Sequence, residues 1–93
     1  MEIVYEESFS KSLFKILTFI SKDKKSSAVK FKNNLKEKIE LLKLSPFMCR
    51  KSKYTDDKNY RDLIFKGYTT IYKIEENQIK ILDIFKWEDR AQT

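Results

Sequence analysis

The sequence predicts an α+β domain in which an antiparallel pair of helices packs on one face of a small, mostly antiparallel sheet, after a short N-terminal strand. Two observations support this prediction. Residues 60–87 alternate apolar and polar side chains with a period of two, which is typical of strands. The preceding half of the 93-residue chain contains two apolar stripes at helical spacing. Helices that precede a three-stranded meander in so short a chain cover a single face of the sheet.

The chain begins with a short apolar segment, residues 2–5, whose β-branched side chains favour a strand that joins the sheet. Glu6, Glu7 and Ser8 follow as a helix entry, with acidic charge suited to a helix N-terminus and Ser8 as the expected cap. The first helix then has an apolar stripe, widened by two more phenylalanines: Phe9, Leu13, Ile16, Leu17 and Ile20, with Phe14 and Phe19.

A second helix is expected after a connection at residues 21–25. Ser26 and Ser27 are its candidate caps, and it stops by residue 45 because Pro46 disfavours a helical conformation at the residue before it. Its buried stripe is Ala28, Phe31, Leu35, Ile39 and Leu42, joined near the end by Leu41 and Leu44. The short link between the stripes favours an antiparallel helical hairpin.

Residues 47–59 show no periodicity and predict a loop, with at most a little strand. Strands are expected at residues 60–66, 68–74 and 78–87, with a break at Gly67. Asn77, in the polar tetrapeptide between the last two strands, tolerates the left-handed conformation that a tight turn needs. In the last strand, strict alternation places on one face Ile79, Ile81, Asp83, Phe85 and Trp87.

Composition excludes several classes of function. A single cysteine, Cys49, forms neither a disulfide framework nor a cysteine-based metal site. The absence of histidine removes the commonest general base and metal ligand, and it excludes Ser–His and Cys–His nucleophilic pairs. One glycine cannot build a phosphate-binding loop. We therefore expect neither a cofactor nor a metal.

Length and hydropathy favour one cytoplasmic domain over residues 1–93. No apolar run approaches the roughly 20 residues of a membrane span, so we expect no membrane association of that kind. The acidic N-terminal segment lacks the basic and apolar regions of a signal peptide. A lone cysteine fits a reducing compartment.

The net charge of +6 is concentrated in the middle of the chain. Residues 21–53 contain eleven Lys or Arg against three Asp or Glu, a net of +8, and the remaining residues have a net of −2. A concentrated basic region favours an anionic partner: nucleic acid, an acidic protein segment or a membrane surface. A lysine-rich, solvated helix face explains the same pattern equally well.

The segments together resemble the RelE/ParE superfamily of toxins from bacterial type II toxin–antitoxin systems, over nearly the whole chain. The resemblance includes the apolar pair Phe19-Ile20, the second-helix pattern A-x-x-F-x-x-x-L-x-x-x-I-x-x-L that starts at Ala28, and Ser45-Pro46. It continues through Tyr60-Arg61-Asp62-Leu63, Gly67-Tyr68, Ile71-Tyr72-Lys73-Ile74 and residues 79–84. The order and spacing of these pieces, rather than any single piece, are typical of the superfamily.

The resemblance implies a growth-inhibiting toxin that an acidic antitoxin neutralises by wrapping around it. ParE-like members inhibit DNA gyrase without being nucleases, whereas RelE-like members are ribosome-dependent mRNA endonucleases. Nucleases of the superfamily commonly have an arginine after the tyrosine that matches Tyr68, and Thr69 stands there. The C-terminal tyrosine of some nucleases also has no counterpart after Trp87. These departures and the long helical hairpin favour the ParE-like branch. A degenerate member that only binds its antitoxin is a third interpretation.

The alternative, mRNA cleavage, needs a base, an acid and a cation that stabilises the phosphorane. The candidate catalytic residues are Arg61, Lys51, Lys53 and Arg90. The candidates for contact with nucleic acid or another target are Lys51, Lys53, Lys66, Lys86 and Trp87. Glu88, beside Trp87, is a further ionisable candidate. A simpler interpretation exists for most of them: Arg61 fits a structural ion pair with Asp62, and exposed lysines are commonplace.

Overall fold

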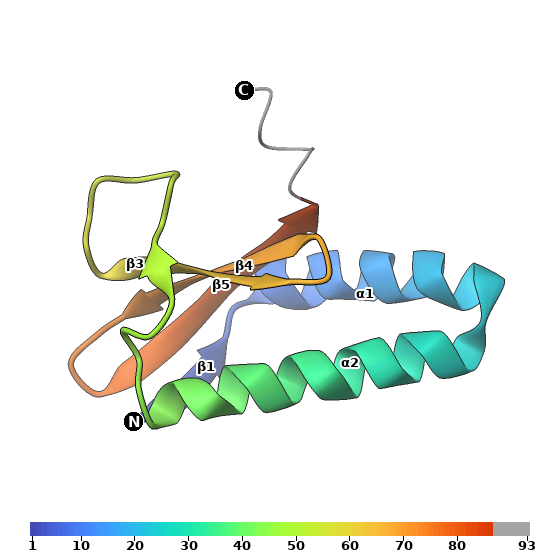
Figure 1. The fold of residues 1–93 in the computed structure, drawn as a ribbon, viewed down its shortest axis with the longest axis horizontal. Coiled ribbons are helices and arrows are strands. Elements are labelled where there is room, and N and C mark those ends of the chain that lie inside the picture. Colours follow the sequence, from blue (N-terminus) through green and yellow to red (C-terminus); the bar gives the residue numbers. More distant parts are fainter. Residues whose placement is uncertain (87–93) are drawn as a thin grey trace.

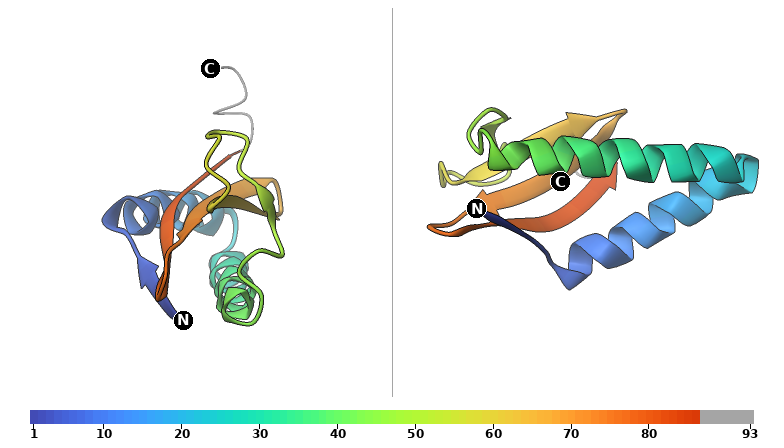
Figure 2. Two further views of the ribbon diagram at one scale, coloured as in Figure 1. Left: turned by 90° about the vertical axis from the view of Figure 1, so that its left-hand side faces the viewer. Right: turned by 90° about the horizontal axis from the view of Figure 1, so that it is seen from below.

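A computed structural model describes residues 1–86, which form two helices and one five-stranded sheet of order β1-β5-β4-β3-β2 (Figure 1). The strands are β1 (Glu2–Tyr5), β2 (Arg50–Lys51), β3 (Tyr60–Phe65), β4 (Tyr68–Ile74) and β5 (Gln78–Lys86). The helices are α1 (Glu7–Asp23) and α2 (Lys25–Glu40), and a single 3-10 turn, η1 (Leu41–Lys43), follows α2. Both helices pack on one face of the sheet, as the sequence predicts (Figure 2). No helix of the described part is long and apolar enough to cross a membrane.

The N-terminal strand joins the sheet in parallel with the last strand. Ile3 lies opposite Ile79 and Tyr5 lies opposite Ile81, whereas the other three strand pairings described are antiparallel. A parallel pair needs a long crossover between its strands, and the two helices provide it. The expectation of a mostly antiparallel sheet with an added N-terminal strand is therefore confirmed.

The first helix begins earlier than its predicted cap. Glu6 is the N-cap residue, with extended backbone and no capping side-chain bond, so the prediction that Ser8 caps the helix is wrong. Ser8 lies in the first turn, and its Oγ donates a hydrogen bond to the Leu82 carbonyl of β5 over 2.6 Å. The hydroxyl therefore ties α1 to the sheet instead of satisfying the helix end.

The connection between the helices is a single residue, Lys24, and not residues 21–25 as predicted. Its extended backbone (φ −157°, ψ 119°) interrupts the helix and lets the chain reverse. Since α2 begins at Lys25, Ser26 and Ser27 lie inside its first turn and are not caps. These three residues are exposed, so water can satisfy the free N–H groups of the helix end.

Four apolar residues that the sequence placed in the core are exposed. Phe14 is 71% exposed and Phe19 is 64% exposed, because the helices extend beyond the sheet and only a narrow stripe of α1 meets it (Figure 1). Leu41 is 51% exposed and Leu44 is 83% exposed. The tighter 3-10 turn after Glu40 changes the side-chain spacing, and it directs Leu42 inward while its neighbours face solvent.

The strict alternation predicted for the last strand is wrong beyond Ile81. Ile71 of β4 pairs with Asp83 whereas Tyr72 pairs with Ile81, so Leu82 is an extra residue in β5. A bulge of this kind moves every later side chain to the other face. Ile84 therefore joins the core under the helices, and Phe85 lies on the opposite face.

The core unites both helices with the helix-facing side of the sheet. Its buried members are Phe9, Phe31, Leu35, Ile39, Leu42, Leu63, Phe65, Tyr72, Ile74, Ile79, Ile81 and Ile84. The predicted strand at residues 60–66 ends at Phe65, because Lys66 (φ 50°) and Gly67 (φ 82°) form the tight turn into β4. Two successive left-handed residues match the right-handed twist of the flanking strands.

Candidate functional site

The pairing of β2 with β3 separates the basic residues of this region onto two faces. Lys51 lies opposite Arg61, and Arg50 lies opposite Asp62. Successive residues of a strand point to opposite faces, so Lys51 and Arg61 share one face while Arg50 and Asp62 share the other. Of the predicted candidates that the structure describes, this pairing brings together Lys51 and Arg61.

The Arg61 guanidinium is held by the segment that precedes β3. Its Nε donates a hydrogen bond to the Lys58 carbonyl over 3.0 Å, and its Nη1 donates to the Cys49 carbonyl over 3.1 Å. The guanidinium carbon also lies 4.8 Å from the centre of the Phe47 ring. The expected ion pair between Arg61 and Asp62 is therefore wrong, because adjacent strand residues face opposite ways and the guanidinium instead anchors residues 47–58.

The Asp62 carboxylate is buried on the face of the sheet that the helices leave free. Its Oδ2 accepts the backbone N–H of Lys53 over 3.1 Å and lies 3.5 Å from Arg50 Nη2. Its Oδ1 has no hydrogen-bond partner among residues 1–86. Asp62 therefore positions the backbone at Lys53, whose own side chain is exposed.

Thr69 occupies the position where superfamily nucleases commonly have an arginine, and its side chain is buried. Thr69 is 0% exposed, and its Oγ1 has no hydrogen-bond partner within the described residues. It lies opposite Phe85 in the β4–β5 pairing, and the Tyr54 ring packs edge-on against Phe85 at 5.3 Å. The loop after β2 thus covers this part of the sheet.

Lys66 and Lys86 lie at the other end of the sheet. Lys66 belongs to the β3–β4 turn, with its Nζ 5.8 Å from the centre of the Phe65 ring. Lys86 ends β5 opposite Tyr68, with its Nζ 6.0 Å from the centre of the Phe19 ring. Five residues of extended strand separate Arg61 from Lys66, a distance of about 17 Å. The described candidates therefore form two separate groups.

The remaining predicted residues, Trp87 and Arg90, lie outside the described part of the chain, as does Glu88. The last strand was predicted to end at Trp87, and the structure describes it as far as Lys86. Within residues 1–86, no group of three His, Cys, Asp or Glu side chains is placed to hold a metal ion.

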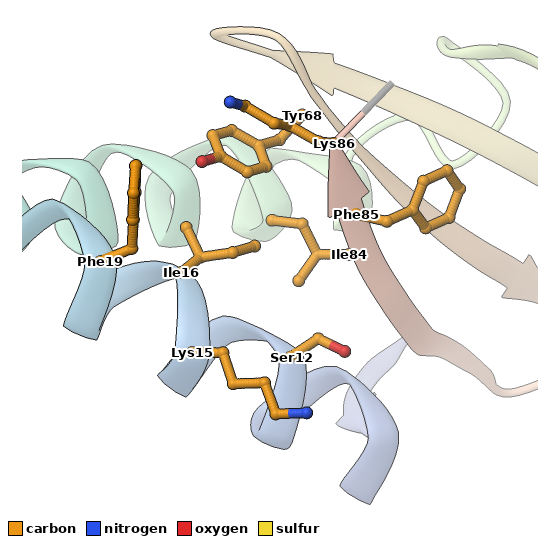
Figure 3. A pocket seen from close by; sticks show the side chains of 8 residues that line it. All are labelled: Ser12, Lys15, Ile16, Phe19, Tyr68, Ile84, Phe85 and Lys86. Atoms are coloured by element: carbon orange, nitrogen blue, oxygen red, sulfur yellow. The ribbon is translucent and has the colours of Figure 1, made fainter. Parts of the chain in front are cut away.

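A hollow of about 400 Å³, here called the α1–sheet hollow, opens between α1 and the end of the sheet (Figure 3). Its lining is mainly apolar, with two lysines and no acidic residue: Ser12, Lys15, Ile16, Phe19, Tyr68, Ile84, Phe85 and Lys86. Ser12 Oγ donates to Asp83 Oδ1 over 2.7 Å, and the same oxygen accepts the Ile84 N–H over 2.8 Å. The bond from Ser12 fastens α1 to β5 beside the hollow. The sequence analysis did not predict this site. The one available signal was Phe19, a large apolar residue that lies off the buried stripe of its helix.

Tyr72 shows how the sheet holds the loop that carries the basic residues. Its hydroxyl donates a hydrogen bond to the Pro46 carbonyl over 2.8 Å. Burial, followed by a hydrogen bond with the Cys49 side chain, raises the pKa of the Tyr72 phenol far above its ordinary value. The phenol is therefore neutral at neutral pH and acts as a structural clamp rather than as a base.

A helical hairpin on one face of a sheet of order β1-β5-β4-β3-β2 is the architecture of RelE/ParE-like toxins. The chain matches the family described as "ParE toxin of type II toxin-antitoxin system, parDE" over residues 3–90, and it belongs to that family. It is therefore a toxin of the type II toxin–antitoxin class. No curated protein gave a significant sequence match.

Solved structures share this fold at low sequence identity. The chromosomal ParDE toxin–antitoxin system of P. aeruginosa matches with a TM-score of 0.74 and 15% identity, over 92% of this chain and 95% of that chain. The DinJ–YafQ complex of E. coli matches with a TM-score of 0.63 and 20% identity, over 96% of both chains. YafQ from E. coli strain BL21(DE3) matches with a TM-score of 0.60 and 22% identity, over 95% of this chain and 94% of that chain.

Proposed function

We propose that this toxin inhibits cell growth by acting on DNA gyrase, and that a cognate acidic antitoxin neutralises it. Membership of the ParE toxin family supports the gyrase target. The observation that carries the choice of target is the dispersal of the basic side chains over two faces and two ends of the sheet.

Cleavage of RNA requires a base, an acid and a stabilising cation around one phosphate, within hydrogen-bond reach of the reacting atoms. Arg61 already binds two backbone carbonyls, and Asp62 holds the backbone of Lys53 on the opposite face of the sheet. Lys66, just beyond the other end of β3, lies about 17 Å from Arg61, too far to share a phosphate with it. Thr69 is fully buried beneath the loop that follows β2. This arrangement supports a toxin that acts by binding rather than by hydrolysis.

The α1–sheet hollow is the proposed docking site of the antitoxin. Its apolar walls fit the apolar side of an amphipathic helix, and Lys15 and Lys86 at its rim attract an acidic one. A strand of the antitoxin can also pair with the free edge of β1, which bonds to β5 alone in the sheet order of the described residues. The ParDE system and the DinJ–YafQ complex each combine a chain of this fold with a partner protein, which supports an antitoxin partner here.

The second candidate function is ribosome-dependent cleavage of mRNA by Lys51, Lys53, Arg61 and Arg90. The direct pairing of Lys51 with Arg61 favours it, because two adjacent cations on one sheet face suit a phosphate. A degenerate chain that binds its antitoxin without toxicity is the third candidate.

One set of assays separates the three functions. Induced expression of the chain should arrest growth, and co-expression of the acidic protein encoded beside it should restore growth. The purified chain should then impair supercoiling by gyrase or trap cleaved DNA. Intact gyrase activity together with mRNA cuts at the ribosomal A site would establish the nuclease instead, and harmless expression would count against both toxic mechanisms.

A further inference from the structure

The segment between β2 and β3, residues 53–59 and here called the strap, lies over the face of the sheet that carries no helix. Figure 2 (left) shows this yellow-green loop on the other side of the sheet from α2. Beneath it, three neighbouring strands each contribute a buried side chain: Asp62 is 1% exposed, Thr69 is 0% exposed and Phe85 is 9% exposed. The helices pack on the opposite face, so they do not account for this burial.

The strap meets the sheet face through its first two residues. The backbone N–H of Lys53 donates a hydrogen bond to Asp62 Oδ2 over 3.1 Å, and the Tyr54 ring packs edge-on against Phe85 at 5.3 Å. Both contacts are made with side chains of the sheet and not with its backbone ladder. They can therefore break while every strand pairing stays intact.

The strap has hydrogen bonds of its own that keep its shape. The Asp57 N–H donates to Thr55 Oγ1 over 3.3 Å, and the Asn59 N–H donates to Asp57 Oδ1 over 2.9 Å. Its two ends are joined, because the Ser52 N–H donates to the Tyr60 carbonyl over 2.9 Å. A compact loop with fixed, adjacent ends and internal bonds is suited to move as one body.

The closed position leaves polar atoms beneath the strap without partners. Within residues 1–86, neither Asp62 Oδ1 nor Thr69 Oγ1 has a hydrogen-bond partner. A buried polar atom in this state costs free energy, and the cost is recovered when water reaches it. Hydration of these two atoms on opening therefore offsets the loss of the Tyr54 ring contact and of the Lys53 hydrogen bond.

We propose that the strap opens and closes over the free face as one body, while the sheet stays folded, and thereby controls access to Asp62 and Thr69. A partner that hydrogen-bonds to either side chain has to bind the open form, so it shifts the population toward that form. The inference goes beyond the proposed function, because it concerns access to the sheet face and holds whether gyrase or mRNA is the target.

Thiol labelling of the full-length chain tests whether the strap opens. In a Cys49→Ser background, Thr69→Cys places one thiol beneath the strap, and Thr70→Cys places one on the helix-facing side of the same strand. Both threonines are buried with unpartnered hydroxyls in the described chain, so the two substitutions are closely matched. The fraction labelled by iodoacetamide over time is measured by mass spectrometry.

The thiol at position 69 should react at least about tenfold faster than the thiol at position 70, because it needs only a local opening. Its labelling rate should change little with urea below the unfolding transition, since a local opening exposes little surface. The thiol at position 70 should react only through global unfolding, with a rate that rises steeply with urea.

Two further variants test what holds the strap closed. Tyr54→Ala removes the ring contact and should speed labelling at position 69 about tenfold, whereas Tyr54→Phe keeps the ring and should leave it unchanged. Thr69→Val, in the chain with its native Cys49, removes an unpartnered hydroxyl whose hydration favours opening. Hydrogen exchange of the Lys53 N–H, followed by NMR, should then slow by about threefold.

Three results would overturn the inference. The first is labelling at position 69 that is as slow and as urea-dependent as labelling at position 70. The second is equal labelling rates in Tyr54→Ala and Tyr54→Phe. The third is unchanged or faster exchange of the Lys53 N–H in Thr69→Val, a measurement that stands even where Tyr54→Ala does not fold.

Discussion

Replacement of Arg61 distinguishes a structural arginine from a catalytic one. Its guanidinium binds the carbonyls of Lys58 and Cys49 and lies over the Phe47 ring, so Arg61→Ala should release the loop that precedes β3. We expect a stability loss without a loss of toxicity. Arg61→Lys keeps the charge but cannot hold two carbonyls in a fixed fork, so it should lose about half as much stability.

The expected magnitude follows from the contacts. The part-buried bond to Cys49 is worth about 1 kcal/mol, and the exposed bond to Lys58 contributes about 0.5 kcal/mol. The contact with the Phe47 ring adds about 0.5 kcal/mol. The total of about 2 kcal/mol should lower the urea midpoint of a chain of this size by roughly 1–2 M. A domain stable by about 6 kcal/mol would remain more than 99% folded after this loss, so growth arrest should persist.

Urea unfolding, followed by tryptophan fluorescence and circular dichroism, measures the first outcome, and induced expression measures the second. Lys51→Ala is the matched control, because Lys51 is exposed opposite Arg61 and should change the stability by less than about 0.5 kcal/mol. An unchanged urea midpoint combined with loss of toxicity in Arg61→Ala would refute the structural role and favour the nuclease.

Four further predictions concern the sheet and the core. Thr69→Val should leave the stability unchanged or raise it by less than about 1 kcal/mol in urea unfolding, since the buried hydroxyl has no described partner, and a clear loss would reveal one. Thr69→Arg should instead cost about 3 kcal/mol or more by burying a charge, and primer extension should find no new mRNA cleavage. Because burial raises the Tyr72 pKa, the stability due to its neutral phenol is complete below about pH 10 and is lost as the pH rises above it. The urea midpoint should therefore fall more steeply between about pH 9 and 11 in the wild type than in Tyr72→Phe, and equal slopes would contradict this. Leu35→Ala, at a side chain 1% exposed, should cost about 3 kcal/mol in the same assay, and a cost under about 1 kcal/mol would show that the core relaxes around it.

The secondary structure was predictable wherever one periodicity persisted. The stripe from Ala28 to Ile39 is buried as predicted, because a helix of constant pitch keeps residues at spacings of three and four on one side. The β4–β5 hairpin was predictable for the same reason, at a period of two. Prediction failed where the period changed, at the bulge after Ile81 and at the 3-10 turn after Glu40, since one extra residue or a tighter turn redirects every side chain that follows.

The candidate site was harder to predict than the fold. Lys51 and Arg61 are ten residues apart in the chain, and only the antiparallel register of β2 with β3 makes them neighbours. The separation of Lys66 from Lys51 likewise follows from the direction of β3. The α1–sheet hollow joins Ser12 to Lys86, residues from opposite ends of the described chain, so no local pattern indicates it.

The sequence by itself determined the class of this protein: the order of its elements, the basic middle of the chain, the absence of histidine chemistry and the resemblance to RelE/ParE toxins. These properties depend on composition and on the order of residues along the chain, so they can be read from the sequence without knowing which segments pack together. The tertiary structure decided which faces the side chains occupy. It buried Thr69, used Arg61 as a loop anchor and left Phe14 and Phe19 exposed in two different surface hollows. The physical reason is that exposure and contact depend on strand register and on how far the helices extend beyond the sheet, and both are set by the packing of segments distant in sequence.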